Sequence, residues 1–379
     1  MTHQPVKFAD LLKFYQFSFR LKSLLWLMPF AILMLARSPA LQALGKPSPS
    51  STKPVSATSR TTAASPPMVL LGLYTRGYLG DDRVVKQEIQ AIDSWAGKQV
   101  SLAGMFFDIE DSNPAYNIPV PLELLRKKGY TAFINLASRR SMAEIARGEV
   151  DGNFKQLAKA FATWSNKNGD RMAFIAPFPE MNGSWESYRE DPANFKLAYQ
   201  RIQRIFAEQG VSKNAVRWVF APNGWSKPEH RFENYYPGDA NTDIVAFSAY
   251  NWGFCSANAS AGQWRAWDGP DKIYAPYVQR MKTMAPNKPI FIAQTATSSL
   301  SKNGTNPVAK DQWMQESYRY LANAGVRAVL YFNLDKECDW ALYRGNGQNS
   351  AGYAAIVANP DFVYVAPSDL ARMNLAQPR

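Results

Sequence analysis

Eight short apolar runs, separated by amphipathic segments, constrain the fold of this chain more than any other feature. The runs are Val69–Leu73, Leu102–Phe107, Thr131–Leu136, Met172–Ala176, Val216–Phe220, Ile244–Phe247, Pro289–Ala293 and Arg327–Phe332. Short runs without strict alternation are typical of strands buried on both faces of a parallel sheet. Eight parallel strands, each followed by a helix, close into a barrel. The pattern therefore predicts the α/β class and a (β/α)8 TIM barrel.

The segments between the runs have the spacing of helices. Apolar residues recur at helical intervals in Val84–Trp95, Asn153–Trp164, Asn194–Phe206 and Gln312–Ala322. The main alternative, an open doubly wound sheet, favours a glycine-rich phosphate-binding loop after its first strand. Residues 74–77, Tyr-Thr-Arg-Gly, do not form such a loop. We therefore expect one barrel over residues 67–366 and a frayed tail over residues 367–379.

The N-terminal region has the layout of a targeting segment. Within residues 1–45, a basic stretch ends at Lys22, an apolar stretch spans Leu24–Ala36, and small residues follow. This order predicts a secretory signal peptide, with an uncleaved signal anchor as the alternative. Residues 46–66, rich in Ser, Thr and Pro, predict a flexible linker. We expect an exported protein that is extracellular, periplasmic or membrane-anchored through its N-terminal segment.

The positive charge of the chain is concentrated in the same region. The formal net charge is +12, and residues 1–66 hold eight Lys or Arg against one Asp, which gives +7. The remaining +5 is spread over residues 67–379 without a basic stripe. Nucleic-acid binding requires such a stripe, so we expect no nucleic-acid partner.

Cysteine and histidine are scarce. Cys255 and Cys338 are able to form one disulfide in an exported protein, and two buried thiols are the alternative. Their spacing does not indicate a metal site, and His3 and His230 are too few for a histidine-based one. We expect no metal and no cofactor.

Polar and aromatic side chains follow the apolar runs, at the ends where a barrel carries its working face. In chain order they are Asp108, Glu110, Asn135, Glu180, Asn182, Trp185, Asn223, Trp225, Tyr250, Asn251, Trp252, Gln294, Asn333, Asp335, Glu337 and Trp340. Carboxylates, amides and indoles on one rim supply an acid, hydrogen bonds to hydroxyl groups and stacking faces for sugars. The set predicts a site for a polysaccharide or oligosaccharide substrate.

Glu180 is the strongest candidate in this set, because Pro177 and Pro179 restrict the backbone before it and the next acid is Glu186. The other carboxylates are equally compatible with ordinary loop ion pairs. The indoles at the strand ends are compatible with lids on the hydrophobic core, and a structural role unrelated to carbohydrate would bury them.

Several segments resemble glycoside hydrolase family 26, the β-mannanase family of retaining barrel enzymes. PEMNGSW at Pro179–Trp185 is similar to its HEMNG-x-W signature, and NLDKECDW at Asn333–Trp340 is similar to its ending after the last strand. VFAPN at Val219–Asn223 and SAYNWG at Ser248–Gly253 resemble its fifth and sixth strands. The resemblance implies that Glu180 is the general acid/base, although Pro179 replaces the histidine of the family.

The seventh strand departs from that family. The segment KPIFIAQTATSS has Gln294 at the position of the family's glutamate nucleophile, and no Asp or Glu lies between Asp271 and Asp311. An amide neither attacks an anomeric carbon nor stabilises positive charge as a carboxylate does. The resemblance also implies that Tyr250, which would hydrogen-bond the nucleophile, holds Gln294 here.

Three interpretations follow for the function. The first is a polysaccharide-binding pseudo-glycosidase that has lost most hydrolysis and grips sugar with Trp185, Trp225, Trp252 and Trp340. The second is an active inverting glycosidase in which another rim carboxylate activates water. The third uses a substituent of the substrate as the nucleophile, with Gln294 as a positioning group.

Overall fold

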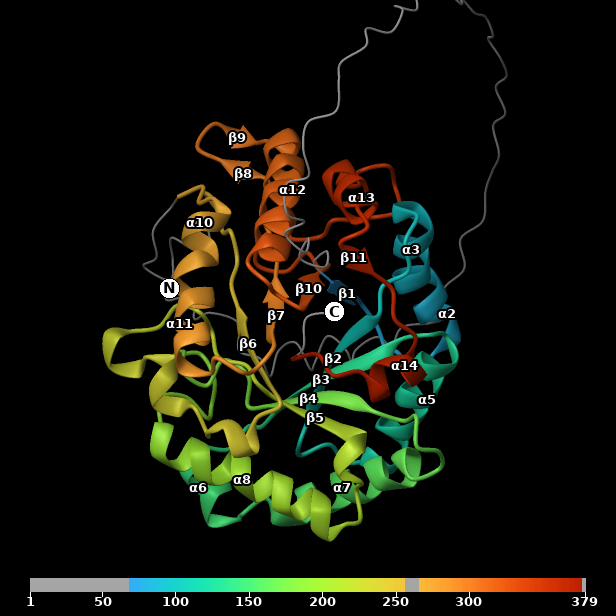
Figure 1. The fold of residues 1–379 in the computed structure, drawn as a ribbon, viewed down its shortest axis with the longest axis vertical. Coiled ribbons are helices and arrows are strands. Elements are labelled where there is room, and N and C mark those ends of the chain that lie inside the picture. Colours follow the sequence, from blue (N-terminus) through green and yellow to red (C-terminus); the bar gives the residue numbers. More distant parts are fainter. Residues whose placement is uncertain (1–67, 256–265, 377–379) are drawn as a thin grey trace, which may run out of the picture.

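The computed structural model describes residues 68–255 and 266–376, so the predicted signal segment (1–45) and linker (46–66) lie outside the described residues. Eight parallel strands form a barrel surrounded by helices (Figure 1). They are β1 (Val69–Tyr74), β2 (Leu102–Asp108), β3 (Thr131–Ala137), β4 (Ala173–Pro177), β5 (Val216–Phe220), β6 (Ile244–Ser248), β7 (Ile290–Thr295) and β10 (Ala328–Phe332). Each coincides with one predicted run, to within two residues at either end.

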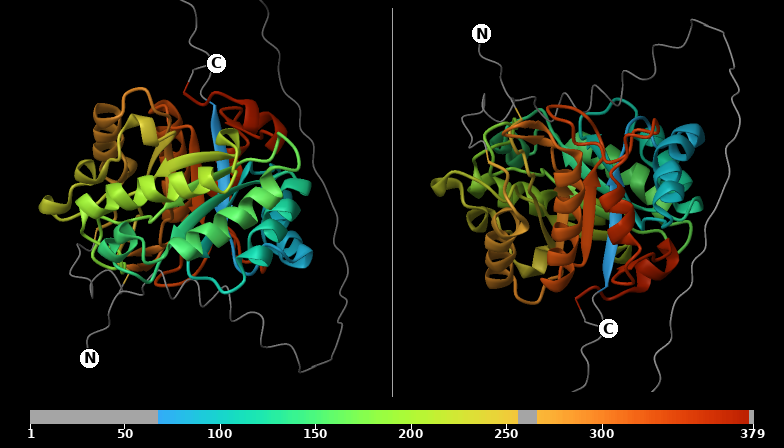
Figure 2. Two further views of the ribbon diagram at one scale, coloured as in Figure 1. Left: turned by 90° about the horizontal axis from the view of Figure 1, so that it is seen from below. Right: turned by 90° about the horizontal axis from the view of Figure 1, so that it is seen from above.

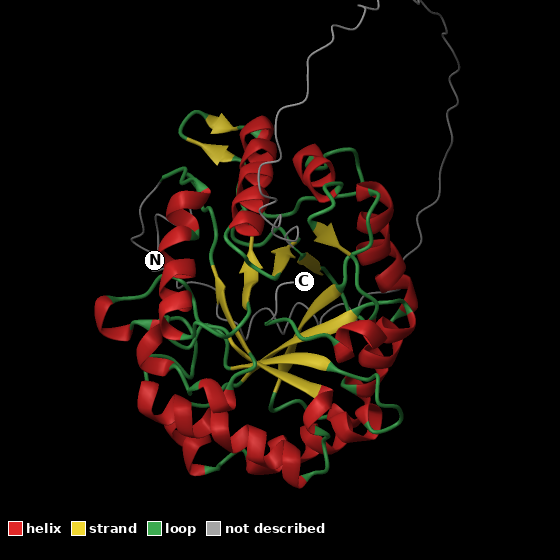
Figure 3. Ribbon diagram, in the orientation of Figure 1, coloured by secondary structure: helices red, strands yellow, loops and turns green. Residues whose placement is uncertain are grey.

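Pairing between the first and last of these strands closes the sheet. Neighbours follow chain order from β1 to β7, and β10 then pairs with both β7 and β1. The closing ladder is parallel and places Leu71 opposite Val329. Figure 3 shows the strands at the centre and the helices around them. The predicted (β/α)8 barrel is therefore confirmed, and the open sheet is excluded.

The strands are apolar because the barrel interior and the helix layer cover both of their faces. Every residue of β1, β2, β3, β4, β6, β7 and β10 is buried. Only Arg217 and Trp218, in β5, are half-buried. A single cluster of buried side chains joins these strands to the surrounding helices. This core fixes the strand ends, and with them the positions of the rim residues.

The helices occupy the predicted intervals. They are α2 (Asp82–Val85), the π-helical η1 (Lys86–Gln90), α3 (Ala91–Ala96), α4 (Pro114–Asn117), α5 (Pro119–Lys127), α6 (Met142–Arg147), α7 (Asp151–Ser165), α8 (Pro192–Glu208), α10 (Pro270–Ile273), α11 (Ala275–Met284), α12 (Pro307–Asn323), α13 (Ala351–Val357) and α14 (Pro367–Arg372). Short 3-10 helices are η2 (Lys213–Ala215), η3 (Pro228–His230), η4 (Phe232–Tyr235) and η5 (Asp239–Asn241). Within the described residues, no helix is long and apolar enough to cross a membrane.

Local chemistry explains where the longest helices begin. At α8, Asp191 accepts a hydrogen bond from the Asn194 backbone at 3.2 Å, and Pro192 occupies the first helical position. At α12, the Asn306 side chain accepts from the Ala309 backbone at 2.9 Å. A side-chain acceptor at the N-cap satisfies one of the free amides of the first turn. Proline at the first position needs no amide partner.

The C-terminal segment is more ordered than the sequence indicated. β11 (Phe362–Val363) pairs in parallel with the start of β1. Helix α14 occupies the first part of the predicted tail, its Leu370 is buried, and Arg217 donates to the Ala371 carbonyl at 3.2 Å. In both views of Figure 2 this red segment lies beside the blue strand β1. The sequence prediction missed this helix because its six residues are too few to show a repeated apolar spacing.

A disulfide joins two loops on the rim. Cys255 follows β6 and Cys338 follows β10, and their Cα atoms are 6.0 Å apart. The disulfide alternative of the sequence analysis is therefore confirmed. Such bonds persist in oxidising compartments and are rare in cytosolic proteins. A small hairpin of β8 (Leu300–Ser301) and β9 (Gly304–Thr305) follows β7.

Candidate active site

The predicted site residues follow the carboxyl ends of strands that meet at one mouth of the barrel. Glu180 comes after β4, Asn223 after β5 and Tyr250 after β6, and Gln294 lies near the end of β7. In a barrel of this type, the loops at this end form the working face. The local structure around each residue decides what that face is able to do.

The backbone is strained where it presents Glu180. Phe178 and Glu180 have φ angles of 54° and 60°, in the left-handed region that residues with a side chain rarely adopt. Backbone hydrogen bonds hold this conformation, from Phe178 to Leu136 at 2.8 Å and from Glu180 to Ala221 at 2.9 Å. Such strain costs about 1–3 kcal/mol per residue and persists only where surrounding contacts impose it. Strained residues of this kind concentrate at functional sites.

The carboxyl group of Glu180 is in a water-poor environment. Burial raises the pKa of Glu180, whereas neighbouring Ser248, Trp185 and Asn223 favour its ionised form. The Trp185 indole donates to Glu180 Oε2 at 2.9 Å. The Ser248 hydroxyl makes no hydrogen bond of ordinary geometry. Desolvation is the largest effect, so Glu180 keeps its proton to a higher pH than an exposed glutamate does.

Gln294 is buried, and only one end of its side-chain amide has a hydrogen-bond partner. Its side chain is 3% exposed, and the expected contact is present, because Tyr250 Oη donates to Gln294 Oε1 at 3.1 Å. The contact directs Oε1 toward Tyr250 and leaves Gln294 Nε2 without a hydrogen-bond partner. Gln294 faces Ser248 across the β6–β7 ladder. The site therefore contains a buried donor on β7 and, on the loop after β4, a carboxyl group with a raised pKa.

The aromatic residues of the rim differ in their exposure. Tyr250 and Trp252 pack against Trp340, with ring centroids 5.4 and 5.0 Å from it. Trp340 is 1% exposed, and its indole lies 3.4 Å from Glu337 Oε2, so it offers no free face in this conformation. Trp252 is half-buried, whereas Trp225 is 49% exposed. Trp225 is thus the exposed indole of the rim, whereas Trp185 and Trp252 are both half-buried.

Asn182 and Asn223 join the loops after β4 and β5. Asn182 Nδ2 donates to the Asn223 carbonyl at 2.9 Å, and Asn182 Oδ1 accepts from the Asn223 backbone at 2.8 Å. Asn182 is 1% exposed. Its amide therefore acts as a backbone-like bridge that positions Glu180 and Asn223, and it has no direct access to a ligand.

Asp108 is a second rim carboxylate whose pKa is raised. Burial and the neighbouring Glu110 raise the pKa of Asp108 to about 6. Arg139 opposes the shift through an ion pair with Asp108 at 3.1 Å. Glu110 accepts from Ser138 at 2.5 Å and from the Arg139 backbone at 3.1 Å. Asp108 and Glu110 thus form a close carboxylate pair at the end of β2. Arg139 partly compensates their negative charge.

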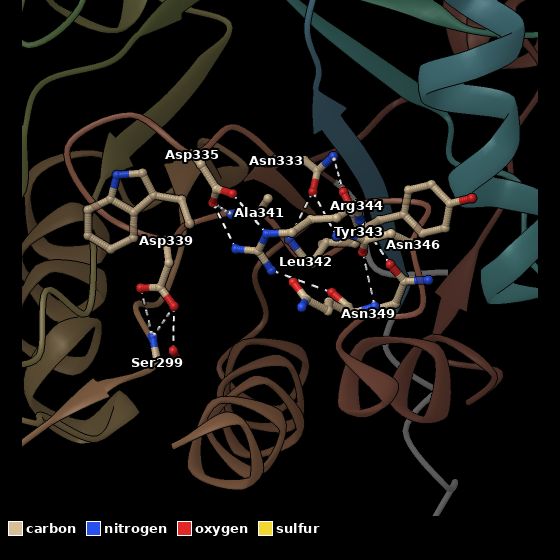
Figure 4. A network of polar contacts seen from close by, with 12 residues as sticks. Ser299, Asn333, Asp335, Asp339, Ala341, Leu342, Tyr343, Arg344, Asn346 and Asn349 are labelled. Carbon is tan, nitrogen blue, oxygen red and sulfur yellow. Dashed lines mark hydrogen bonds and ion pairs between the residues drawn. The ribbon is translucent and has the colours of Figure 1, made fainter. Parts of the chain in front are cut away.

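Asp335 and Asn333 stabilise the segment after β10. Asp335 accepts from the Ala341 backbone at 2.9 Å and forms two hydrogen bonds with the Arg344 guanidinium at 2.8 and 2.9 Å. Asn333 Oδ1 accepts from the Leu342 backbone at 2.8 Å. Figure 4 shows how these contacts fold the segment back on itself. The carboxylate of Asp335 is therefore occupied by backbone and arginine donors.

Lys310 of α12 supports the same segment from inside. It is 3% exposed, and its ammonium group donates to the carbonyls of Asp339, Trp340 and Ala341 at 2.5, 3.2 and 3.1 Å. Burial lowers the pKa of Lys310 to about 8. The Asp339 carboxylate accepts from the Ser299 backbone at 3.1 Å, which ties the segment to the loop after β7.

The sequence analysis did not single out Lys310, Ser248 or Lys336. Lys336 pairs with Glu337 at 2.7 Å and also favours the ionised form of Glu180. Ser248 had one usable signal, its place at the end of the sixth apolar run. Lys310 and Lys336 had none, since a lysine on a helix or loop is normally a solvated charge. Among the described residues, no cluster of three His, Cys, Asp or Glu is arranged to hold a metal ion.

Comparison with known proteins finds similar folds among solved structures. No protein-family model matches the chain, and no curated protein matches it. Several solved structures match it in fold. A β-mannanase of glycoside hydrolase family 26 from Bacteroides ovatus has 14% sequence identity and a TM-score of 0.57, with 82% of this chain and 93% of that chain covered.

Two further structures agree with that result. A modular endo-β-1,4-mannanase from Cellulomonas fimi has 15% identity and a TM-score of 0.57, covering 80% of this chain and 74% of that one. A β-1,3-glucanosyltransferase from Rhizomucor miehei, solved with laminaritriose, has 12% identity and a TM-score of 0.50, covering 79% and 98%. At these identities the likeness establishes the fold. The chain is similar in fold to family 26 β-mannanases.

Proposed function

We propose that the barrel binds a β-linked polysaccharide, of the mannan type or a related β-glycan, across the mouth that carries Glu180. Glu180 acts as the acid that faces the glycosidic oxygen. Retaining hydrolysis is absent or very slow, because the position of the nucleophile is occupied by Gln294. The protein is exported, a proposal supported by the targeting layout of residues 1–45 and by the disulfide of the barrel.

The observation that carries the proposal is the contact between Tyr250 and Gln294. Retaining glycosidases need an ionised carboxylate opposite the acid. Gln294 is neutral at every pH, and its Oε1 already accepts a hydrogen bond from Tyr250. A neutral amide in that position favours binding without formation of a glycosyl-enzyme intermediate.

The free end of Gln294 supports a role in sugar binding. A buried donor without a partner costs about 1–3 kcal/mol. Gln294 Nε2 is shielded from solvent. A sugar hydroxyl oxygen would therefore satisfy it, and recover that cost, once the side chains that cover it move. A nucleophilic acetamido group of the substrate requires an acceptor for its N–H. Tyr250 already engages one of the two lone pairs of Gln294 Oε1, and a neutral amide is a weaker acceptor for that N–H than a carboxylate.

Inverting hydrolysis is the second candidate, and the pKa of Asp108 is the observation that favours it. A general base works best with a pKa near the working pH, and burial raises that of Asp108 to about 6. The mechanism also requires a separation of about 6.5–9.5 Å between acid and base carboxyl groups. Asp335 is a weaker candidate, because Arg344 and the Ala341 backbone occupy its oxygens.

Binding and hydrolysis are separated by one experiment. The purified full chain and its Glu180→Ala variant are run through affinity gels containing β-mannan, a β-xylan or a mixed-linkage β-glucan, and incubated with each to measure new reducing ends. We expect retardation in at least one gel without new reducing ends. Hydrolysis by the wild type that is abolished in Glu180→Ala would overturn the binding-only proposal.

The anomeric form of any product distinguishes the two mechanisms. Inversion through Asp108 predicts that the first product is the α-anomer in a proton NMR time course, and that Asp108→Asn abolishes it. The matched variant Asp335→Asn is expected to leave the rate within about threefold, because that carboxylate is already engaged. A β-anomer as the first product would rule out inversion.

A further inference from the structure

We propose that Tyr78 and Tyr116 form a distal sugar subsite, which stacks on a pyranose unit of a neutral β-linked polysaccharide several units away from Glu180. This subsite rests on the proposed function, since its occupant is the far end of the chain bound at Glu180. It extends the site to a part of the rim where the sequence motifs mark no residue.

The two tyrosines form an open aromatic surface. Their ring centroids are 6.3 Å apart, with an interplanar angle of 22°. Tyr116 is 48% exposed, one of five large hydrophobic side chains with such exposure among the described residues, and Tyr78 is half-buried beneath it. Aromatic rings are normally buried because they bring the largest gain in apolar area. A stacked pair that leaves the outer ring in water is therefore available to a ligand with a flat apolar face, as a pyranose has.

The pair lies on the same rim as Glu180. Tyr78 follows β1, and Tyr116 is on α4, in the connection after β2. Both connections leave the carboxyl ends of their strands, as the connection that carries Glu180 does. The pair is thus on the working face, two to three strands around the barrel from β4.

The barrel topology places another open aromatic residue across the mouth. In the closed order of eight strands, β1 is separated from β5 by three strands in either direction. The loop after β5 carries Trp225, which is 49% exposed. A polysaccharide that contacts both ends of this diameter passes over the mouth, where Glu180 and Gln294 lie. An extended β-linked chain is able to span such a path, whereas a compact ligand is not.

Charge at this end of the path favours a neutral sugar. The connection after β2 carries three acids, Asp108, Glu110 and Asp111. Asp111 accepts two hydrogen bonds from Asn117 at 3.0 Å. Burial, and after it the neighbouring Tyr116 and Asp111, raise the pKa of Tyr78. Carboxylates next to an aromatic platform accept hydrogen bonds from sugar hydroxyl groups and repel a uronate. The occupant is therefore a neutral sugar unit.

Calorimetry on the full chain, with oligosaccharides of two lengths, tests this subsite. The ligands are mannohexaose and cellohexaose, each compared with its disaccharide. We expect Tyr116→Ala to weaken binding of the preferred hexasaccharide about tenfold, since the stacking face is lost. Binding of the disaccharide is expected to stay within about twofold. Tyr116→Phe keeps the ring, so its affinity for the hexasaccharide is expected to stay close to that of the wild type.

Tyr364→Ala is the matched control. Tyr364 is 40% exposed but follows β11, beside the start of β1, at the opposite end of the barrel. It should leave both affinities unchanged. If the wild type binds the hexasaccharide and Tyr116→Ala binds it equally well, the subsite is overturned. The subsite is also overturned if Tyr116→Ala weakens binding of the hexasaccharide and the disaccharide equally. Either result leaves the proposed function standing. Absence of wild-type binding to every oligosaccharide would overturn the proposed function together with the subsite.

Discussion

On one side of the barrel mouth, the backbone at Glu180 is held in the left-handed region, and its carboxyl group keeps a proton to a raised pH. On the other side, Gln294 is neutral, 3% exposed and hydrogen-bonded to Tyr250. Under the proposed function, the first side has what an acid catalyst needs, whereas the second lacks the charge that a nucleophile needs. That function therefore assigns to this mouth the binding of a glycosidic oxygen without its retaining hydrolysis.

The Gln294 side is also the more heavily cross-linked. Lys310 binds three consecutive carbonyls after β10, and the bond between Cys255 and Cys338 joins that segment to the loop after β6. The Glu180 side contains two strained residues, and the amide bridge between Asn182 and Asn223 supports it. The two sides therefore differ in how they are held as well as in their charge.

The largest effect is expected from Gln294→Glu, which would make the two sides chemically complementary. The introduced carboxylate replaces the Gln294 side chain beside Tyr250, on the same mouth as Glu180, whose pKa is raised by burial. We expect retaining hydrolysis of the bound polysaccharide to be at least about 100-fold faster than in the wild type. Each lowering of the activation free energy by about 1.36 kcal/mol raises the rate about tenfold. New reducing ends measure the gain.

The double variant Glu180→Gln/Gln294→Glu is the control for that gain. It keeps the new carboxylate and removes the acid, so the gain should disappear. No gain in the single variant, with polysaccharide binding retained, would show that the two sides differ by more than one residue.

Loss of the disulfide should weaken the cross-linked side. The bond closes a loop with a sequence separation of 83 residues. The chain-entropy model predicts that replacing both cysteines by serine lowers the free energy of unfolding by about 4 kcal/mol. Urea denaturation under non-reducing conditions measures it. A loss below about 1 kcal/mol would mean that the hydrogen bonds after β10 hold the segment alone.

Lys310→Met is expected to lower the free energy of unfolding by about 2–3 kcal/mol, because three buried carbonyls lose their donor. Lys302→Met, at an exposed position, is the control and should have little effect. Burial lowers the pKa of Lys310 to about 8, below its usual value of about 10.4. The unfolded chain then binds more protons between these pH values, so the stability of the wild type relative to Lys310→Met should increase from pH 8 to 10.

The smallest effect concerns the pH dependence of the Glu180 side. In the Gln294→Glu background the acid must be protonated, so kcat/KM should fall as the pH rises through the pKa of Glu180. The Trp185 indole favours the ionised form of Glu180. Trp185→Phe should therefore raise that pKa and move the alkaline limb to higher pH, whereas Trp225→Phe should not. A shift to lower pH would contradict the assignment of Glu180 as the acid.

The fold could be predicted because its signal is local and repeated. Each apolar run is buried on both faces, so composition alone marks the strand, and the strand ends then bring Glu180, Tyr250 and Gln294 to one rim. Other roles depend on loop conformation. Asn182 bridges two loops, and Asp335 binds a backbone amide and Arg344. Both are residue types that often bind ligands, so the sequence alone does not distinguish these structural roles from ligand binding. Tyr78 and Tyr116 come from separate connections, so no sequence pattern pairs them.

Covalent trapping tests the central claim most directly. The full chain and its Gln294→Glu variant are incubated with a fluorinated β-mannosyl fluoride, which traps the glycosyl-enzyme intermediate of retaining enzymes, and their intact masses are measured. We predict no adduct on the wild type and a single adduct at position 294 on the variant. An adduct on any wild-type carboxylate would contradict the claim that this barrel has lost its nucleophile.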